Sequence, residues 1–306
     1  MHRNIVIGPP GTGKTTFLKN KVDAIIKEGK AQPNEIGYFS FTVKAAEEIR
    51  NRVAGEDMSE NELKKMYPYF CTLHSLAYKR LRLEPHEIMD ELDYMELSDM
   101  TGRKFVNKMK KGNGMDFSMP TAQSQYQDTI NLAYAKYPHD EERLPRIFKE
   151  VKLSDYGARN TILQMDKDLK NFKRDRHKLE YVDYFNTFLE TKNPPPLKYL
   201  FIDEAQDLSA HQWMVVDMIQ KVSQPIETYV AGDDDQAIFR WAGADIEHFI
   251  NMANDKNNTI MPLTQSYRVP KSVHTLATKM AQSISNRIEK QYDPRDDEGE
   301  RKVLNF

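Results

Sequence analysis

The sequence predicts a doubly wound α/β fold with a mostly helical insertion. Two observations lead to this prediction. Short apolar runs alternate with longer helix-like stretches in the first and last thirds of the 306 residues. Between those parts, from about Leu83 to Lys178, the sequence is charged and helix-prone and has few strand signals. Strands that alternate with helices favour a parallel sheet covered by helices on both faces.

Six runs have the length and composition of strands. Most are almost continuously apolar rather than alternating, which is typical of parallel strands buried on both faces. They are Asn4–Ile7, Ile36–Phe41, Tyr69–Leu73, Lys198–Ile202, Thr228–Ala231 and Thr259–Leu263.

Helical patterns follow these runs, beginning with Thr15–Lys27 after the first. The clearest is Lys271–Lys290, where apolar residues recur at three- and four-residue steps and form one stripe. The stripe comprises Val273, Leu276, Ala277, Met280, Ala281, Ile284 and Ile288.

The insertion divides the α/β domain into two parts of the chain. We expect the domain to comprise residues 1–82 and 179–291, with the helical insertion at 83–178. Glycines and a proline predict a loop at Lys111–Pro120. Three prolines in Asn193–Pro196 predict a stop before the next strand. Residues 292–306 read as a charged turn followed by the start of a strand at Lys302–Phe306, which predicts that the natural chain continues.

Composition excludes several classes of protein. Hydrophobic residues make up 39% and charged residues 29%, as in ordinary globular proteins. The single cysteine, Cys71, excludes an internal disulfide framework and a cysteine-based zinc site. The net charge of -2 excludes an overall basic coat but leaves room for a local basic groove. No apolar run approaches the roughly 20 residues that span a membrane, and no signal peptide is present, so an intracellular protein is expected.

The N-terminal segment fits the phosphate-binding loop pattern G-x-x-x-x-G-K-[ST] in full. It follows a predicted strand and opens a predicted helix, which makes a chance glycine-rich turn the weaker alternative. Its glycines allow backbone N–H groups to surround a phosphate, and the helix N-terminus attracts the negative charge. Lys14 is expected to reach the β and γ phosphates of ATP, and Thr15 to ligate Mg²⁺. The candidate nucleotide-binding residues here are Gly8, Pro9, Pro10, Gly11, Thr12, Gly13, Lys14, Thr15 and Thr16.

Two carboxylates end the predicted strand at Lys198–Ile202. Ligands bind at the carboxyl edge of such sheets, which is where Asp203 and Glu204 would lie. Asp203 is the candidate second metal ligand, and Glu204 is the candidate base that orients the attacking water. An acidic pair that merely caps a strand is the alternative, and the phosphate-binding loop makes it the weaker one.

Two later segments also place polar residues after strands. One is Gly232–Ala244, which contains three aspartates, Gln236 and Trp241. The other is Leu263–Arg268, which ends in Tyr267 and Arg268. Arginine suits phosphate recognition because its planar fork makes bidentate contacts. The alternatives are a core position for Tyr267 and a surface ion pair for Arg268.

Together these segments resemble, in order, six motifs of superfamily 1 helicases of the UvrD/Rep/PcrA type. The resemblance spans Gly8 to Arg268. The GDDDQAIFRWAGA segment at Gly232–Ala244 is the most specific match. The other matching segments are Gly8–Thr15 (motif I), Tyr38–Ile49 (Ia), Cys71–Leu76 (Ib), Asp203–Asp207 (the DEAQD motif II) and Leu263–Arg268 (IV).

The resemblance implies an ATP-dependent DNA helicase or single-stranded DNA translocase with a RecA-like fold, using ATP and Mg²⁺. It implies that Gln236 senses the γ-phosphate, that Arg268 contacts it in the transition state, and that Tyr267 stacks on adenine. It also implies that Trp241 stacks on a base of single-stranded DNA, although a core tryptophan is the alternative. The remaining implied DNA-binding residues are Phe41, Thr42 and His74.

The resemblance further implies 3′-to-5′ travel on single strands and at junctions with duplex DNA, and roles in DNA repair or replication. The expected location is the cytoplasm, either nucleoid-associated or viral in a host cell. The chain departs from the family at Val43 and Ser266, where asparagines are usual. In the family, a glutamine-containing segment before motif I usually reads adenine, and only seven residues precede Gly8 here, so the resemblance does not imply how adenine is selected. Nothing after Arg268 resembles motifs V and VI, so we expect the first motor domain, with residues 292–306 as a tail or the start of the second.

Basic residues gather at two places in the insertion. Their side chains could bind nucleic-acid phosphates, or they could form an ordinary solvated face. The sequence favours a solvated face for the first group and favours neither alternative for the second. The first group is Lys104, Lys108, Lys110 and Lys111, and the second is Lys167, Lys170, Lys173, Arg174, Arg176 and Lys178. Two other functions remain possible for the whole chain, namely a phosphate-loop ATPase of another class and a module that binds ATP and DNA without turnover.

Overall fold

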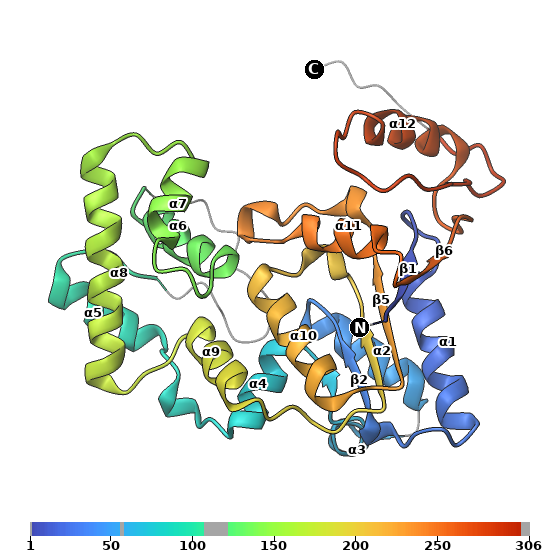
Figure 1. The fold of residues 1–306 in the computed structure, drawn as a ribbon, viewed down its shortest axis with the longest axis horizontal. Helices are drawn as coiled ribbons and strands as arrows, with labels where there is room; N and C mark the ends of the chain where they lie inside the picture. The colour runs from blue at the N-terminus through green and yellow to red at the C-terminus, as the bar shows by residue number, and fades with distance from the viewer. Residues whose placement is uncertain (1, 56–57, 107–121, 301–306) are drawn as a thin grey trace.

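A computed structural model describes residues 2–55, 58–106 and 122–300. Its centre is a six-stranded, wholly parallel sheet with the order β3-β2-β4-β5-β1-β6 (Figure 1). The doubly wound α/β prediction is therefore confirmed. The strands are β1 (Asn4–Ile7), β2 (Ile36–Phe39), β3 (Phe70–Cys71), β4 (Tyr199–Ile202), β5 (Glu227–Gly232) and β6 (Thr259–Pro262). The strand expected from Lys302 falls outside the described residues.

Helices cover both faces of the sheet. Those of the α/β part are α1 (Lys14–Lys27), α2 (Val43–Ala54), α3 (Glu60–Met66), α4 (Leu73–Leu81), α9 (Tyr181–Thr191), α10 (Ala210–Ser223), α11 (Ile246–Asn254) and α12 (Lys271–Ala281). Short 3₁₀ turns lie at η1 (Pro33–Glu35), η2 (Pro85–Glu87), η3 (Ala205–Asp207), η4 (Asp234–Gln236) and η5 (Arg240–Ala242).

Two clusters of buried apolar side chains form the core, one on each side of the sheet. On one side, Leu18 of α1 and Ile49 of α2 pack against alternate residues of the strands. On the other, side chains from α4, α9, α10 and α11 pack together, including Trp213 of α10. Each fully buried side chain of this size stabilises the fold by roughly 1.5–3 kcal/mol.

Four aromatic rings cross the first of these faces in a row. Phe70 (β3), Tyr38 (β2), Phe201 (β4) and Tyr229 (β5) have successive centroid distances of 5.6, 6.1 and 5.1 Å and lie nearly parallel. They come from neighbouring strands because parallel register places these residues opposite one another. The row fixes Tyr38, whose hydroxyl belongs to the candidate site.

The segment between β3 and β4 includes helices that form a second lobe (Figure 1). These are α5 (Glu91–Thr101), α6 (Ala122–Lys136), α7 (Arg143–Glu150) and α8 (Tyr156–Arg176). They bury a core of their own, with Leu97, Ile130, Ile147 and Leu169 among its residues. The insertion is therefore mostly helical, as predicted. The loop expected at Lys111–Pro120 lies outside the described residues.

Several expected boundaries were wrong. β3 ends at Cys71 because Thr72 begins a helix, where its hydroxyl accepts a hydrogen bond from Ser75 N at 3.1 Å. β2 ends at Phe39, two residues earlier than predicted. β6 lies at the edge of the sheet and is largely exposed, although the apolar run predicted burial.

The helix expected at Lys271–Lys290 ends at Ala281, so the prediction was wrong for its last nine residues. The serines that follow offer the backbone alternative partners, as in the hydrogen bond from Ser283 Oγ to Met280 O at 2.6 Å. The backbone N–H of Ile288 instead donates to Asp234 Oδ2 at 2.7 Å. A tertiary contact thus outweighs the helical periodicity of the stripe.

Candidate functional site

The first strand leads into the predicted phosphate-binding loop at the carboxyl edge of the sheet. β1 ends at Ile7, and α1 begins at Lys14. Gly11 and Gly13 have φ values of 77° and 83°, in the left-handed region that favours glycine. A Cβ atom on Gly11 would lie 2.5 Å from Cβ of Arg268, so the close approach of these segments requires glycine. A glycine-dependent turn at a helix N-terminus is an arrangement that suits phosphate.

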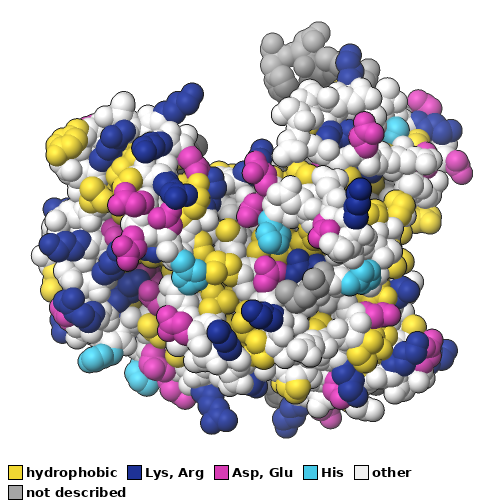
Figure 2. Space-filling view, viewed as in Figure 1, with side chains coloured by type: hydrophobic (Ala, Val, Ile, Leu, Met, Phe, Trp, Pro, Cys, Tyr) yellow, Lys and Arg dark blue, Asp and Glu magenta, His cyan; other side chains and the backbone are white. Residues whose placement is uncertain are grey.

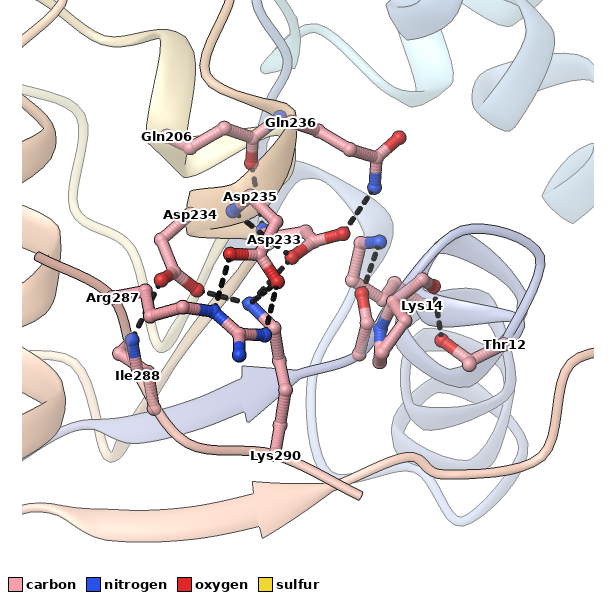
Figure 3. A network of polar contacts seen from close by, with 12 residues as sticks. Thr12, Lys14, Gln206, Asp233, Asp234, Asp235, Gln236, Arg287, Ile288 and Lys290 are labelled. Carbon is pink, nitrogen blue, oxygen red and sulfur yellow. Dashed lines mark hydrogen bonds and ion pairs between the residues drawn. The ribbon is translucent and has the colours of Figure 1, made fainter. Parts of the chain in front are cut away.

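Lys14 is turned back toward its own loop. Its side chain is largely buried, and Nζ donates to Gly8 O at 2.7 Å (Figure 3). The hydroxyl of Thr12 donates to Pro9 O at 2.8 Å and closes the turn. The ammonium and the positive end of α1 therefore lie together, which would favour an anion in the loop.

Thr15 and Asp203 come from different elements and are in contact. Thr15 Oγ1 donates to Asp203 Oδ2 at 2.9 Å, and Tyr38 OH donates to the same oxygen at 2.8 Å. Burial and the charge of Glu204 raise the pKa of Asp203, and the two hydroxyl donors oppose that rise.

A hydroxyl beside a buried carboxylate fits Mg²⁺, which uses one or two carboxylates together with substrate phosphates. Among residues 2–55, 58–106 and 122–300, no group of three or more histidines, cysteines and acids could hold a metal. Metal binding at Thr15 and Asp203 would therefore depend on the nucleotide as well.

Glu204 follows Asp203 in an unusual backbone conformation. Its φ of 52° lies in the left-handed region, which a residue with a side chain adopts at a cost of about 1–3 kcal/mol. Its carboxylate accepts a hydrogen bond from Gln206 Nε2 at 2.8 Å. Gln206 Oε1 in turn accepts from Asp233 N at 3.0 Å. The candidate base is thereby connected to the end of β5.

The turn after β5 continues this chain of hydrogen bonds. Asp233 is fully buried, and its Oδ2 accepts from Gln236 Nε2 at 2.5 Å (Figure 3). Arg287 and Lys290 contact the carboxylates of Asp233–Asp235, and neither cation was identified from the sequence. The only available signal was two cations three residues apart, and the helical pattern explained them equally well.

The segment after β6 lies against the phosphate-binding loop. Tyr267 N donates to Gly11 O at 2.9 Å, and the Ser266 hydroxyl donates to Pro10 O at 2.8 Å. The same hydroxyl accepts from the backbone N–H groups of Arg268 at 3.3 Å and Val269 at 3.1 Å. The serine thus retains polar contacts despite its departure from the family pattern. The Tyr267 side chain is 75% exposed, so a core position for it is wrong.

Three aromatic residues near motif III form a row in which Trp241 is exposed and Phe41 and Phe239 are half-buried. The Phe41 and Phe239 centroids are 5.2 Å apart, and those of Phe239 and Trp241 are 6.3 Å apart. Trp241 is 58% exposed, so the core-tryptophan alternative is wrong. Sequence reasoning missed Phe239, although it lies within the quoted motif. A row of rings that ends in an exposed tryptophan suits stacking on bases.

The structure places His74 and Thr42 in other surroundings. The His74 ring stacks on Phe185 at 4.2 Å and meets the edge of Tyr181 at 5.2 Å. Burial, with a smaller contribution from His211, lowers the pKa of His74 to about 3. The hydroxyl of Thr42 caps α2 by accepting from Ala45 N at 3.2 Å.

Much of the second basic group of the insertion takes part in ion pairs. Lys173 is nearly buried between Glu180 and Asp183, and Lys178 pairs with Asp93 at 2.8 Å. The remaining pairs are Lys170–Asp166, Arg174–Asp175 and Arg176–Glu96. On the face shown in Figure 2, lysines and arginines are interspersed with acids. These contacts favour a structural role for Lys173 and Lys178. In the first group, Lys108, Lys110 and Lys111 lie outside the described residues.

The chain matches a known protein family and several curated proteins. A family model described as the UvrD/REP helicase N-terminal domain matches residues 1–257. Similar proteins include the ATP-dependent DNA helicase PcrA of Bacillus subtilis (strain 168), 24% identical over 96% of this chain and 39% of that protein. PcrA of Leuconostoc citreum is 23% identical over 94% of this chain and 38% of its own. PcrA of Staphylococcus aureus (strain COL) is 25% identical over 92% of this chain and 38% of that protein. The chain thus spans less than two fifths of these relatives' length.

Proposed function

The chain belongs to the UvrD/REP helicase N-terminal domain family, and from that premise we propose that it is the ATP-binding motor domain of an ATP-dependent DNA helicase or single-stranded DNA translocase. One observation supports this above all. Gln236 is connected to Glu204 by hydrogen bonds that run through Asp233 and Gln206. Trp241 follows Gln236 by five residues on the same connection. A nucleotide site and an exposed tryptophan on one short connection suit an enzyme that moves along DNA by hydrolysing ATP.

Each residue of the loop and its neighbours has a proposed task. Lys14 would meet the β and γ phosphates, and Thr15 and Asp203 would hold Mg²⁺, which would supply positive charge beside the phosphates. Glu204 orients the attacking water and accepts its proton. Gln236 senses the γ-phosphate, and Arg268 stabilises it in the transition state. Tyr267 stacks on adenine.

The proposed DNA track comprises Trp241, Phe41, Thr42 and His74, with Phe239 added by the structure. Base–aromatic stacking contributes about 1–3 kcal/mol per base and tolerates any sequence. Single strands, junctions with duplex DNA and 3′-to-5′ travel belong to the same proposal. No described helix is long and apolar enough to cross a membrane.

We also propose the domain boundaries stated above, with the insertion at 83–178. The separate apolar core of α5–α8 supports them. So does the parallel bridge between Ile88 and Leu179, which brings the two ends of the insertion together.

Substitution of the proposed base tests the function. Glu204→Gln should lower the rate of ATP hydrolysis, measured as phosphate release with and without oligothymidylate, by about 10²–10⁴-fold, because an amide cannot accept the proton. Affinity for Mg-ATP should be nearly unchanged. Glu247→Gln, an exposed change on α11, is the matched control and should hydrolyse ATP like the wild type. Full activity of the Glu204→Gln variant would contradict the assignment of the base.

A second candidate function is a module that binds ATP and DNA without strand separation. The described residues form one parallel sheet, which provides one wall of the nucleotide site and favours this second function for residues 1–306 taken alone. Hydrolysis stimulated by single-stranded DNA would support the motor, and binding of both ligands without turnover would support the module.

A further inference from the structure

The chain beyond α12 turns back across the candidate site. We call residues 287–293 the return segment. Its first part contacts the acidic turn after β5, where Arg287 Nε and Nη2 donate to the two oxygens of Asp235 at 2.9 and 2.6 Å. Its last part contacts the phosphate-binding loop, where Tyr292 OH donates to Pro10 O at 3.3 Å. The return segment therefore connects the two halves of the nucleotide site.

Lys290 has a more enclosed side chain than Arg287, the other cation of this contact. Its side chain is only 4% exposed, and Nζ lies 2.7 Å from Asp233 Oδ1 and 3.1 Å from Asp235 Oδ2 (Figure 3). It also pairs with Asp234. Burial alone would lower the pKa of Lys290, but the surrounding carboxylates outweigh it and raise the pKa above its usual value. Lys290 is therefore a charged group at the centre of three carboxylates.

Asp233 is the residue that Lys290 and Gln236 share. Oδ1 accepts from Lys290, Oδ2 accepts from Gln236 Nε2 at 2.5 Å, and the backbone N–H is bound by Gln206. Both carboxylate oxygens and the backbone are thus engaged. An ammonium that fixes one oxygen also fixes the rotation of the carboxylate, and so determines where the second oxygen holds the amide of Gln236.

We propose that Lys290 is a positioning residue for Gln236, which it orients toward the γ-phosphate through Asp233. This inference rests on the proposed function, because it presumes that the site binds ATP. Lys290 touches neither nucleotide nor water in this role and acts only through Asp233.

A purely structural role for Lys290 makes a different prediction. If the ion pairs only hold the return segment in place, their loss should lower stability and weaken every nucleotide equally. If Lys290 orients Gln236, their loss should weaken only nucleotides that have a γ-phosphate. The ratio of the affinities for ATPγS and ADP separates these cases without relying on catalytic activity.

The test measures the dissociation constants of ATPγS and ADP with Mg²⁺ by calorimetry. Lys290→Met should weaken ATPγS about tenfold, the order expected for one hydrogen bond to a charged group, and should change ADP less than about twofold. Lys279→Met, an exposed change on α12, is the matched control and should alter neither constant. Because Lys290→Met leaves buried carboxylates unpaired, Lys290→Met/Asp234→Asn provides a second variant with less uncompensated charge.

A double-mutant comparison separates the positioning role of Lys290 from the γ-phosphate-sensing role of Gln236. Gln236→Ala should reduce the preference for ATPγS, and adding Lys290→Met should then change it no further, because Lys290 acts through Gln236. Equal weakening of ATPγS and ADP by both Lys290 variants would overturn the positioning role. An unchanged preference in Gln236→Ala would instead overturn the assignment of Gln236 as the γ-phosphate sensor, and the inference would fall with it.

Discussion

Tyr38 contributes a hydroxyl to the acidic site, although sequence reasoning quoted it within motif Ia and gave it no role of its own. Its ring lies in the aromatic row, and its hydroxyl donates to Asp203 Oδ2. Tyr38→Phe should keep the ring and lose the hydrogen bond to a buried charged group, which costs about 1.5–3 kcal/mol of unfolding free energy. Urea denaturation measures this cost. Tyr156→Phe, at a position that is 75% exposed, is the control and should be neutral. Equal stability of the two variants would contradict the contact.

Asp207 offers a test by pH. Burial and the charge of Glu204 raise its pKa to about 7, and Oδ1 is buried without a hydrogen-bond partner in the described structure. Because the folded pKa lies above the unfolded value of about 3.9, folding favours the protonated acid, and stability is lost as pH rises from about 4 to 7.

Asp207→Asn should therefore melt at a higher temperature than the wild type at pH 8. The advantage should shrink at pH 5, where the wild-type acid is mostly protonated. Thermal denaturation at both values of pH measures the difference. Asp99→Asn on the exposed face of α5 serves as control and should show no such trend. A larger advantage at pH 5 than at pH 8 would show that the direction of the pKa shift is wrong.

The two tryptophans of the chain differ in their surroundings. Trp213 is 1% exposed and Trp241 is 58% exposed. Trp241→Ala should lower affinity for single-stranded DNA by about 1–3 kcal/mol, with a similar loss for every sequence and a nearly unchanged salt dependence. Its melting temperature should stay near that of the wild type. Titration of a labelled oligonucleotide decides the matter, and unchanged affinity would remove Trp241 from the DNA site.

At the scale of elements, the positions of the strands were predictable, but the burial of β6 was not. β1 and β4 lie within one residue of their predicted bounds because their sequences are continuously apolar and both faces are covered. β6 and α12 have apolar residues that remain exposed, Met280 by 65% for example. An apolar pattern indicates which residues could be buried, but it does not indicate whether another part of the chain covers them. For the same reason, residues 287–290 of the return segment were predicted to be helical, although α12 ends at Ala281.

The phosphate-binding loop depends on a close approach that glycine alone allows. At Gly11, alanine would meet both an unfavourable φ and a Cβ atom 2.5 Å away on Arg268. At Gly29, φ is also positive, at 68°, but nothing lies within 4 Å of the added atom. Gly29→Ala should therefore lose only the conformational cost, about 1–2 kcal/mol.

Gly11→Ala should lose more stability than Gly29→Ala and should also weaken ATP binding, because the loop and the Ser266–Arg268 segment must separate. Denaturation and nucleotide titration of the pair measure both effects. Similar losses of stability in the two variants, with ATP affinity retained, would contradict the packing of the loop against Arg268.

At the scale of the molecule, the motifs predicted that the site residues gather at one edge of the sheet. They did not predict the hydrogen bonds and ion pairs that connect one motif to another. Asp203, Glu204 and Gln236 were placed near one another because parallel strands end at one edge. The links through Gln206, Asp233 and Lys290 depend on side-chain directions that no spacing rule specifies. The sequence of the insertion differs in composition from the rest of the chain, but that difference did not predict which residues form its separate core.

The activity expected of residues 1–306 alone depends on the single parallel sheet that the described residues form. One parallel sheet provides one wall of a nucleotide site, and movement along DNA requires two bodies whose separation changes with the nucleotide. An arginine supplied to a phosphate-binding loop from another body contributes about 10³–10⁵ in rate. We therefore expect this chain to hydrolyse ATP slowly, with some stimulation by single-stranded DNA, and not to separate a labelled duplex. Lys14→Ala should abolish the slow hydrolysis and so exclude a contaminating ATPase. Efficient strand separation by the wild-type chain would show that residues 1–306 form a complete motor.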